Sequence, residues 1–105
     1  MLEQHIAERL RGAGFSAPSD KGRWIKGSPG FAHTWLPDPS IAELIGILPI
    51  EVEDESLQIC FERDGRVEAG YHTYGWDSES VSVICGSTLE ALAELWLKLK
   101  ENNLI

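Results

Sequence analysis

The first part of the chain spaces its apolar residues with the period of a helix. Four of them, from Leu2 to Ala13, follow one another at intervals of three or four positions, and Gly12 and Gly14 supply a stop. This pattern predicts an amphipathic helix over residues 2–13. Its narrow apolar stripe should lie on the surface of the core.

Two further helices are predicted by capping boxes, in which a serine oxygen and the glutamate three residues later satisfy free amides at a helix start. Ser40–Glu43 opens a short helix over 41–47, and Ser87–Glu90 opens a long one over 88–101. The long helix consists almost wholly of Leu, Ala, Glu, Lys and Trp, which are mostly good helix formers.

The long helix is apolar over more than half of its circumference. Its polar stripe contains only Glu90, Glu94, Lys98 and Glu101. A helix of this kind must be covered on several sides. We expect a sheet to cover one side, and another helix or another chain to cover the other.

Between these two capped helices the apolar period changes to two, which predicts strands over 57–62, 67–72 and 80–85. A two-residue turn would pair Glu62 with Val67 and mix the apolar and polar faces. A three-residue loop ending in Gly65 at positive φ instead pairs Phe61 with Val67 and sets Glu62 across from Arg66. We expect the three-residue loop.

The segment from Phe15 to Pro39 is interrupted by Gly and Pro, and only 23–26 and 32–36 look extended. We expect at most two short, paired edge strands there. The fold class is therefore α+β, with a three-stranded antiparallel meander and helices packed on one face. The short N-terminal strands can extend the meander, and its opposite face is polar and open.

Length and charge limit the classes of function. The chain has 105 residues, which fits one α+β domain over 1–105. Seventeen acidic and nine basic residues give a net charge of −8. Residues 1–36 carry +2 and residues 37–105 carry −10, so the acidic character lies in the second part. Because nucleic-acid binders cluster basic residues, direct binding of nucleic acid is not expected.

Membrane, export and disulfide signals are not found in the sequence. No apolar run approaches the roughly 18 residues that a membrane helix needs. The first residues lack a basic region followed by an apolar one. Cys60 and Cys85 are too few for a disulfide framework and fall on opposite faces of the predicted sheet. We therefore expect a cytoplasmic protein that does not associate with membranes.

The sequence contains none of the common nucleotide, zinc or hydrolase motifs, so we expect no cofactor, no metal site and no catalytic residues. Cys60 and His72 both point to the polar face, but the predicted register separates them by roughly 13 Å, too far for proton transfer. An enzyme that uses Cys60 is a minor alternative.

The first candidate binding residues lie in an aromatic, glycine-rich turn between the second and third strands. Tyr and Trp on loops favour interfaces because they bury a large area with few rotatable bonds. We expect Tyr74, Trp76 and Asp77 to anchor a partner beside His72. The alternative is that Tyr71 and Trp76 fold back into the core.

Carboxylates complete this candidate surface. Glu62 and Glu68 belong to the polar face, and Glu53, Asp54 and Glu55 form an acidic stretch before the first strand. Negative potential of this kind favours a partner protein with a basic surface.

A second candidate site is basic and aromatic. Arg23, Trp24 and Lys26, with His33, could stack a base and hold a phosphate. This alternative predicts a nucleotide-binding sponge that acts as a homodimer through the apolar last helix. More often such a segment is an edge strand whose Trp packs inward.

Two stretches, residues 35–45 and 87–99, resemble segments of small uncharacterised proteins encoded by tailed bacteriophages and prophages. In those proteins a Trp-Leu-Pro stretch leads into a short helix, and a capped Leu/Ala/Trp helix closes the chain. The resemblance implies a phage or mobile-element origin. It leads us to expect a non-catalytic, anti-CRISPR-like inhibitor of host defence that blocks a basic nucleic-acid-binding surface in the host cytoplasm.

Overall fold

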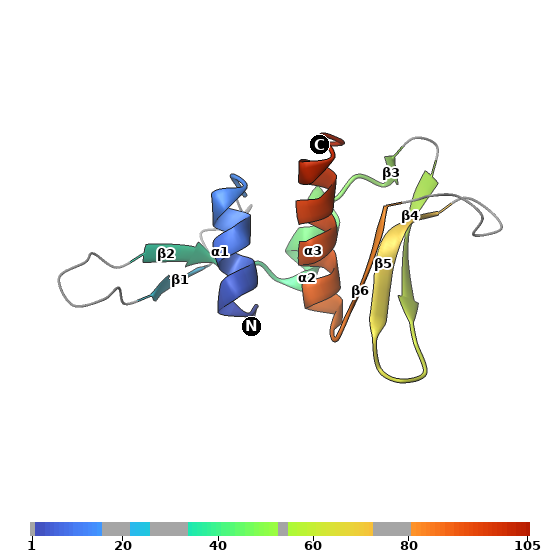
Figure 1. Ribbon diagram of the computed structural model, residues 1–105, viewed down its shortest axis with the longest axis horizontal. Helices are drawn as coiled ribbons and strands as arrows, with labels where there is room; N and C mark the ends of the chain where they lie inside the picture. Colours follow the sequence, from blue (N-terminus) through green and yellow to red (C-terminus); the bar gives the residue numbers. More distant parts are fainter. Residues whose placement is uncertain (1, 16–21, 26–33, 53–54, 73–80) are drawn as a thin grey trace.

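The computed structural model describes residues 2–15, 22–25, 34–52, 55–72 and 81–105. Within these ranges the chain forms three helices and six strands (Figure 1). In chain order they are α1 (Gln4–Gly12), β1 (Gly22–Ile25), β2 (Thr34–Pro37), α2 (Ile41–Ile47), β3 (Glu51–Val52), β4 (Glu55–Phe61), β5 (Val67–His72), β6 (Ser82–Cys85) and α3 (Thr88–Glu101).

The main sheet has the order β3-β4-β5-β6, with every neighbouring pair antiparallel. The predicted register of its central hairpin is confirmed. Phe61 pairs with Val67, and the Glu62 amide donates to the Arg66 carbonyl at 2.8 Å. Gly65 has a φ of 92°, the left-handed conformation that favours glycine at this turn.

Two features of the sheet differ from the sequence expectation. The strands β1 and β2 pair with each other but form a separate two-stranded sheet, so they do not extend the meander. They lie on the side of α1 away from the main sheet (Figure 1), because Leu36 of β2 is buried in the core beside α1. The fourth strand of the main sheet is instead β3, which consists of Glu51 and Val52 and is too short to show an alternating pattern.

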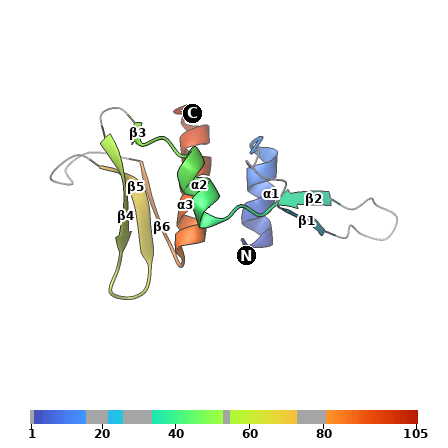
Figure 2. The same ribbon diagram turned by 180° about the vertical axis from the view of Figure 1, so that it is seen from behind.

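The helix α3 lies at the centre of the molecule. It packs on β5 and β6 on one side and on α1 and α2 on the others (Figures 1 and 2). Leu92, Leu95 and Leu99 are completely buried, and Leu97 is 5% exposed. The apolar sides of α3 are thus covered by helices of the same chain. The predicted capping box at Ser40 and Glu43 forms at the start of α2, whereas at the start of α3 the Ser87 side chain accepts from the Glu90 amide without the reciprocal bond.

Gly70 of β5 lies where two strands approach closely. A Cβ atom there would sit 2.6 Å from the Cβ of Ser82 and 2.7 Å from the Val81 carbonyl oxygen. The Cβ atom of Ser82 is bonded directly to the backbone of β6, and the Val81 oxygen belongs to the backbone just before this strand. The backbone of β6 would therefore have to move. A glycine is needed at this position because nothing larger fits.

We expect Gly70→Ala to lower the free energy of unfolding by about 1–3 kcal/mol, the usual cost of overpacking. Gly46→Ala in α2 is the matched control, since no atom lies within 4 Å of the new methyl group. This control should raise stability by about 0.5–1 kcal/mol. Urea titration measures both. Equal effects of the two substitutions would contradict the close approach of β5 and β6.

Tyr71 ends the apolar side of β5. Its side chain is 1% exposed, and its hydroxyl donates to the Pro49 carbonyl at 2.8 Å. Burial raises the pKa of Tyr71 to about 12. The alternative that Tyr71 folds back into the core is thus confirmed, whereas Trp76 lies outside the described residues.

The raised pKa of Tyr71 predicts a pH dependence of stability. The folded chain holds the phenol proton more tightly than the unfolded chain, so this stabilisation is complete below about pH 10 and is lost as the pH rises toward about 12. Tyr71→Phe should cost about 1 kcal/mol at pH 7, through the lost hydrogen bond. The difference in free energy of unfolding between the unaltered chain and this variant should narrow at pH 11 in urea titrations. A difference that stays constant with pH would contradict the burial of the ionisable hydroxyl.

Candidate functional site

Within the described residues, no helix packs on one face of the main sheet, and we call this face the outer face. Residues alternate between the two faces of a strand. Because Ile59, Ala69 and Val83 pack into the core beneath α3, their neighbours point outward. The outer-face positions of the three longer strands are Ser56, Gln58, Cys60, Glu68, Gly70, Ser82 and Ile84. Most of these residues are uncharged, so the middle of the face is polar but nearly neutral.

Carboxylates gather where the β4–β5 hairpin turns. Glu62 and Glu68 occupy diagonal positions on the two strands, roughly 7–8 Å apart. Arg66 lies between them in the register, but its guanidinium binds Asp64 at 2.7 Å. The Arg66 amide, which also donates to Asp64, lowers the pKa of that carboxyl. Arg66 is therefore held by Asp64 in the turn, and Glu62 and Glu68 define an acidic end of the outer face.

The acidic stretch before β4 is divided between the two sides of the sheet. Glu51 pairs with Ser56 and shares its outward direction. Glu55 pairs with Val52, which packs against the core, so Glu55 stands on the helix side. The predicted surface therefore does not run without interruption from Glu55 to Glu68.

Several predicted binding residues cannot be placed. Tyr74, Trp76 and Asp77 lie outside the described residues, as do Glu53, Asp54, Lys26 and His33. The backbone of His72 lies opposite Ser56 at the end of β5, and Arg23 and Trp24 belong to β1. The aromatic anchor and the nucleotide site both stay predictions.

The sequence reasoning missed a groove along the edge strand β6. It has a volume of about 410 Å³ and lies between β6, α3 and the first residues of α1. Its lining includes His5, Glu90, Glu94 and Lys98. Three of these four belong to the polar stripe of α3. The stripe was visible in the sequence, but nothing there showed that a sheet edge runs beside it.

The two cysteines lie on opposite faces, as predicted. Burial, and then the charges of Glu94 and Glu90, raise the pKa of the Cys85 thiol. This thiol is protonated at neutral pH and is a poor nucleophile. Cys60 lies opposite Glu68 on the outer face. Among the described residues, no three His, Cys, Asp or Glu side chains form a metal-binding group.

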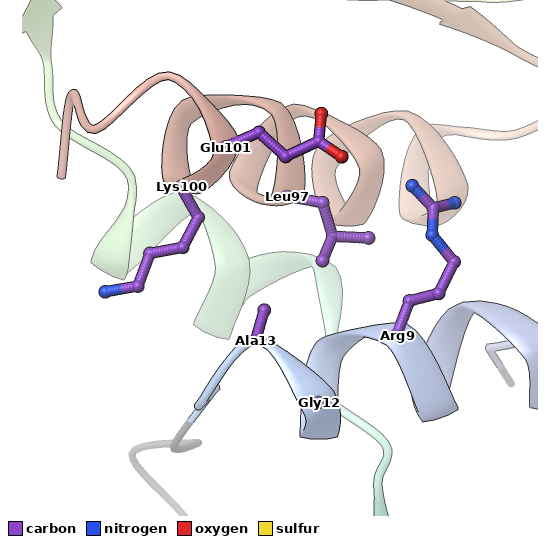
Figure 3. A pocket seen from close by; sticks show the side chains of 6 residues that line it. All are labelled: Arg9, Gly12, Ala13, Leu97, Lys100 and Glu101. Atoms are coloured by element: carbon purple, nitrogen blue, oxygen red, sulfur yellow. The ribbon is translucent and has the colours of Figure 1, made fainter.

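A second hollow of about 410 Å³ lies between the C-terminal halves of α1 and α3 (Figure 3). Arg9 and Lys100 line it, with Leu97 pointing toward Ala13 between the two helices. Both cations have partners elsewhere, because Arg9 binds Glu94 and Lys100 stands over the Trp96 ring. The C-terminal ends of helices also disfavour anions. This hollow therefore does not form an anion site.

Comparison of the chain with protein-family models, with curated protein sequences and with solved structures found no match in any of the three. In the ranges that the structure describes, no helix has the length and apolar character needed to cross a membrane.

Proposed function

We propose that this protein is a non-catalytic binding protein that docks the outer face of its sheet on a basic surface of a partner protein. The observation that supports the proposal is the placement of all three helices on one side of the sheet. The other side keeps a broad strand surface with carboxylates at its ends and uncharged residues in its middle.

This arrangement suits recognition of a basic protein. Charges at the rim of an interface raise the association rate and select partners of opposite sign, while the centre supplies close packing. Ile84 is 52% exposed beside Glu68 and offers an apolar contact within the face. The net charge of −8 acts in the same direction at longer range.

The finer part of the proposal concerns the identity of the partner. The resemblance to phage and prophage proteins favours a host protein that handles nucleic acid, whose basic groove this chain would block. An anti-CRISPR-like inhibitor of host defence fits that description.

A capture experiment tests the proposal. The immobilised protein should retain basic, nucleic-acid-handling proteins from a bacterial lysate at low salt and less at moderate salt, because rim charges are screened. The double substitution Glu62→Lys with Glu68→Lys should reduce the retained amount at least about tenfold.

The matched control is Glu8→Lys with Glu101→Lys, which makes the same change of net charge at exposed helix positions. It should retain nearly as much partner as the unaltered chain. Recovery of no basic nucleic-acid-handling protein would contradict the proposal. Equal losses in the two double variants would show that only the overall charge matters.

A further inference from the structure

The strand β6 ends the main sheet and keeps backbone groups that no described residue of the sheet bonds. The Tyr71 amide donates to the Val81 carbonyl at 3.0 Å. Hydrogen-bonded pairs alternate in an antiparallel ladder, so odd-numbered residues of β6 bond to β5. Ser82 and Ile84 therefore direct their N–H and C=O groups away from the sheet. Lys98 confirms this direction, since its Nζ donates to the Ser82 carbonyl at 3.0 Å.

The polar stripe of α3 runs beside this open edge. Lys98 contacts the start of β6 through Ser82. Glu90 and Glu94 lie toward the other end, where their charges act on Cys85. The helix and the strand are antiparallel neighbours joined by a short turn. The groove therefore presents negative charge at one end and positive charge at the other.

We propose that β6 of a second copy of this chain pairs antiparallel with this edge, so that two sheets join across a two-fold axis. Val83 lies at the axis, and Ser82 pairs with Ile84 of the partner subunit. In this register the outward N–H and C=O groups of both strands bond to each other. The Ser82 carbonyl then accepts from the amide of Ile84 of the partner subunit in place of Lys98, whose ammonium is released for a new contact. The proposal goes beyond the proposed function and uses a different part of the surface.

The charges of the stripe are complementary to themselves in this arrangement. A two-fold axis places Lys98 beside the partner's Glu90 and repeats the same contact on the other side. Glu94 faces the partner's Glu94 near the axis, where its ion pair with Arg9 supplies the opposite charge. A second copy of the chain supplies this match of opposite charges by symmetry, because the two-fold axis repeats each contact.

The two copies of α3 also have room beside each other in the joined structure. Neighbouring strands are about 4.8 Å apart, and α3 packs over β5 and β6. Its axis then lies about 5 Å from the two-fold axis, which separates the two copies of α3 by about 10 Å. Packed helices are normally 8–10 Å apart.

Sedimentation velocity of the full chain over about a hundredfold range of concentration should show a monomer that converts to a dimer. A chain that stays monomeric at every concentration overturns the proposal, whether or not another partner uses the groove.

Charge exchange tests the predicted contact within that dimer. Lys98→Glu and Glu90→Lys should each weaken dimerisation about tenfold, because each places like charges together twice. The variant with both substitutions should dimerise nearly as well as the unaltered chain. Lys100→Glu and Glu101→Lys are matched controls on the same helix, and they should have little effect.

Restoration by the double variant cannot arise from a more stable monomer, because each substitution opposes the helix dipole. A double variant as weak as the single ones overturns the proposed register. Amide exchange of the unaltered chain gives a second readout that needs no variant. The amides of Ser82 and Ile84 should become protected as concentration rises, whereas that of Val83 is already bonded within the sheet. Exchange at Ser82 and Ile84 that is independent of concentration also overturns the proposal.

Discussion

The need to cover α3 on nearly every side determines the arrangement of this protein. Four of its five leucines are buried to 5% exposure or less, and each of these four contributes about 1.5–3 kcal/mol by leaving water. One sheet can cover only one side of a helix. The chain covers the remaining sides with α1 and α2, and β1 and β2 follow on the outside of α1. All three described helices therefore lie on one side of the main sheet, and none of them covers its outer face.

The covering of α3 also determines where charged side chains lie on the surface. Three residues of the polar stripe of α3 face the groove beside β6, namely Glu90, Glu94 and Lys98, whereas Glu101 lines the hollow beside α1. Among the described acidic residues of the second part of the chain, Glu62 and Glu68 lie at the hairpin end of the outer face, and Glu90 and Glu94 lie along the groove. Two surfaces result, with different partners proposed for each. The outer face suits a basic protein, and the edge of β6 suits a second copy of the chain.

Much of the fold could be predicted from local sequence signals. Alternation and the sterically required turn at Gly65 determined the register of β4 and β5, and serine caps located α2 and α3. The position of β1 and β2 could not be predicted, because it depends on contacts of Leu36 with a helix distant in sequence. The strand β3 was missed since its pairing, and not its composition, makes Glu51 and Val52 a strand. For the site, the sequence indicated Glu62 and Glu68 but not the groove, which exists only once α1, β6 and α3 meet.

Thiol labelling of the native chain tests most directly whether the helices cover one face of the sheet and leave the other open. Cys60 stands on the outer face, and Cys85 lies on the helix side with a pKa raised by burial and by Glu94 and Glu90. The account predicts that a thiol reagent modifies Cys60 in the folded protein well before Cys85, whose labelling rate should rise with pH or on unfolding. Equal or faster modification of Cys85 at neutral pH would contradict it.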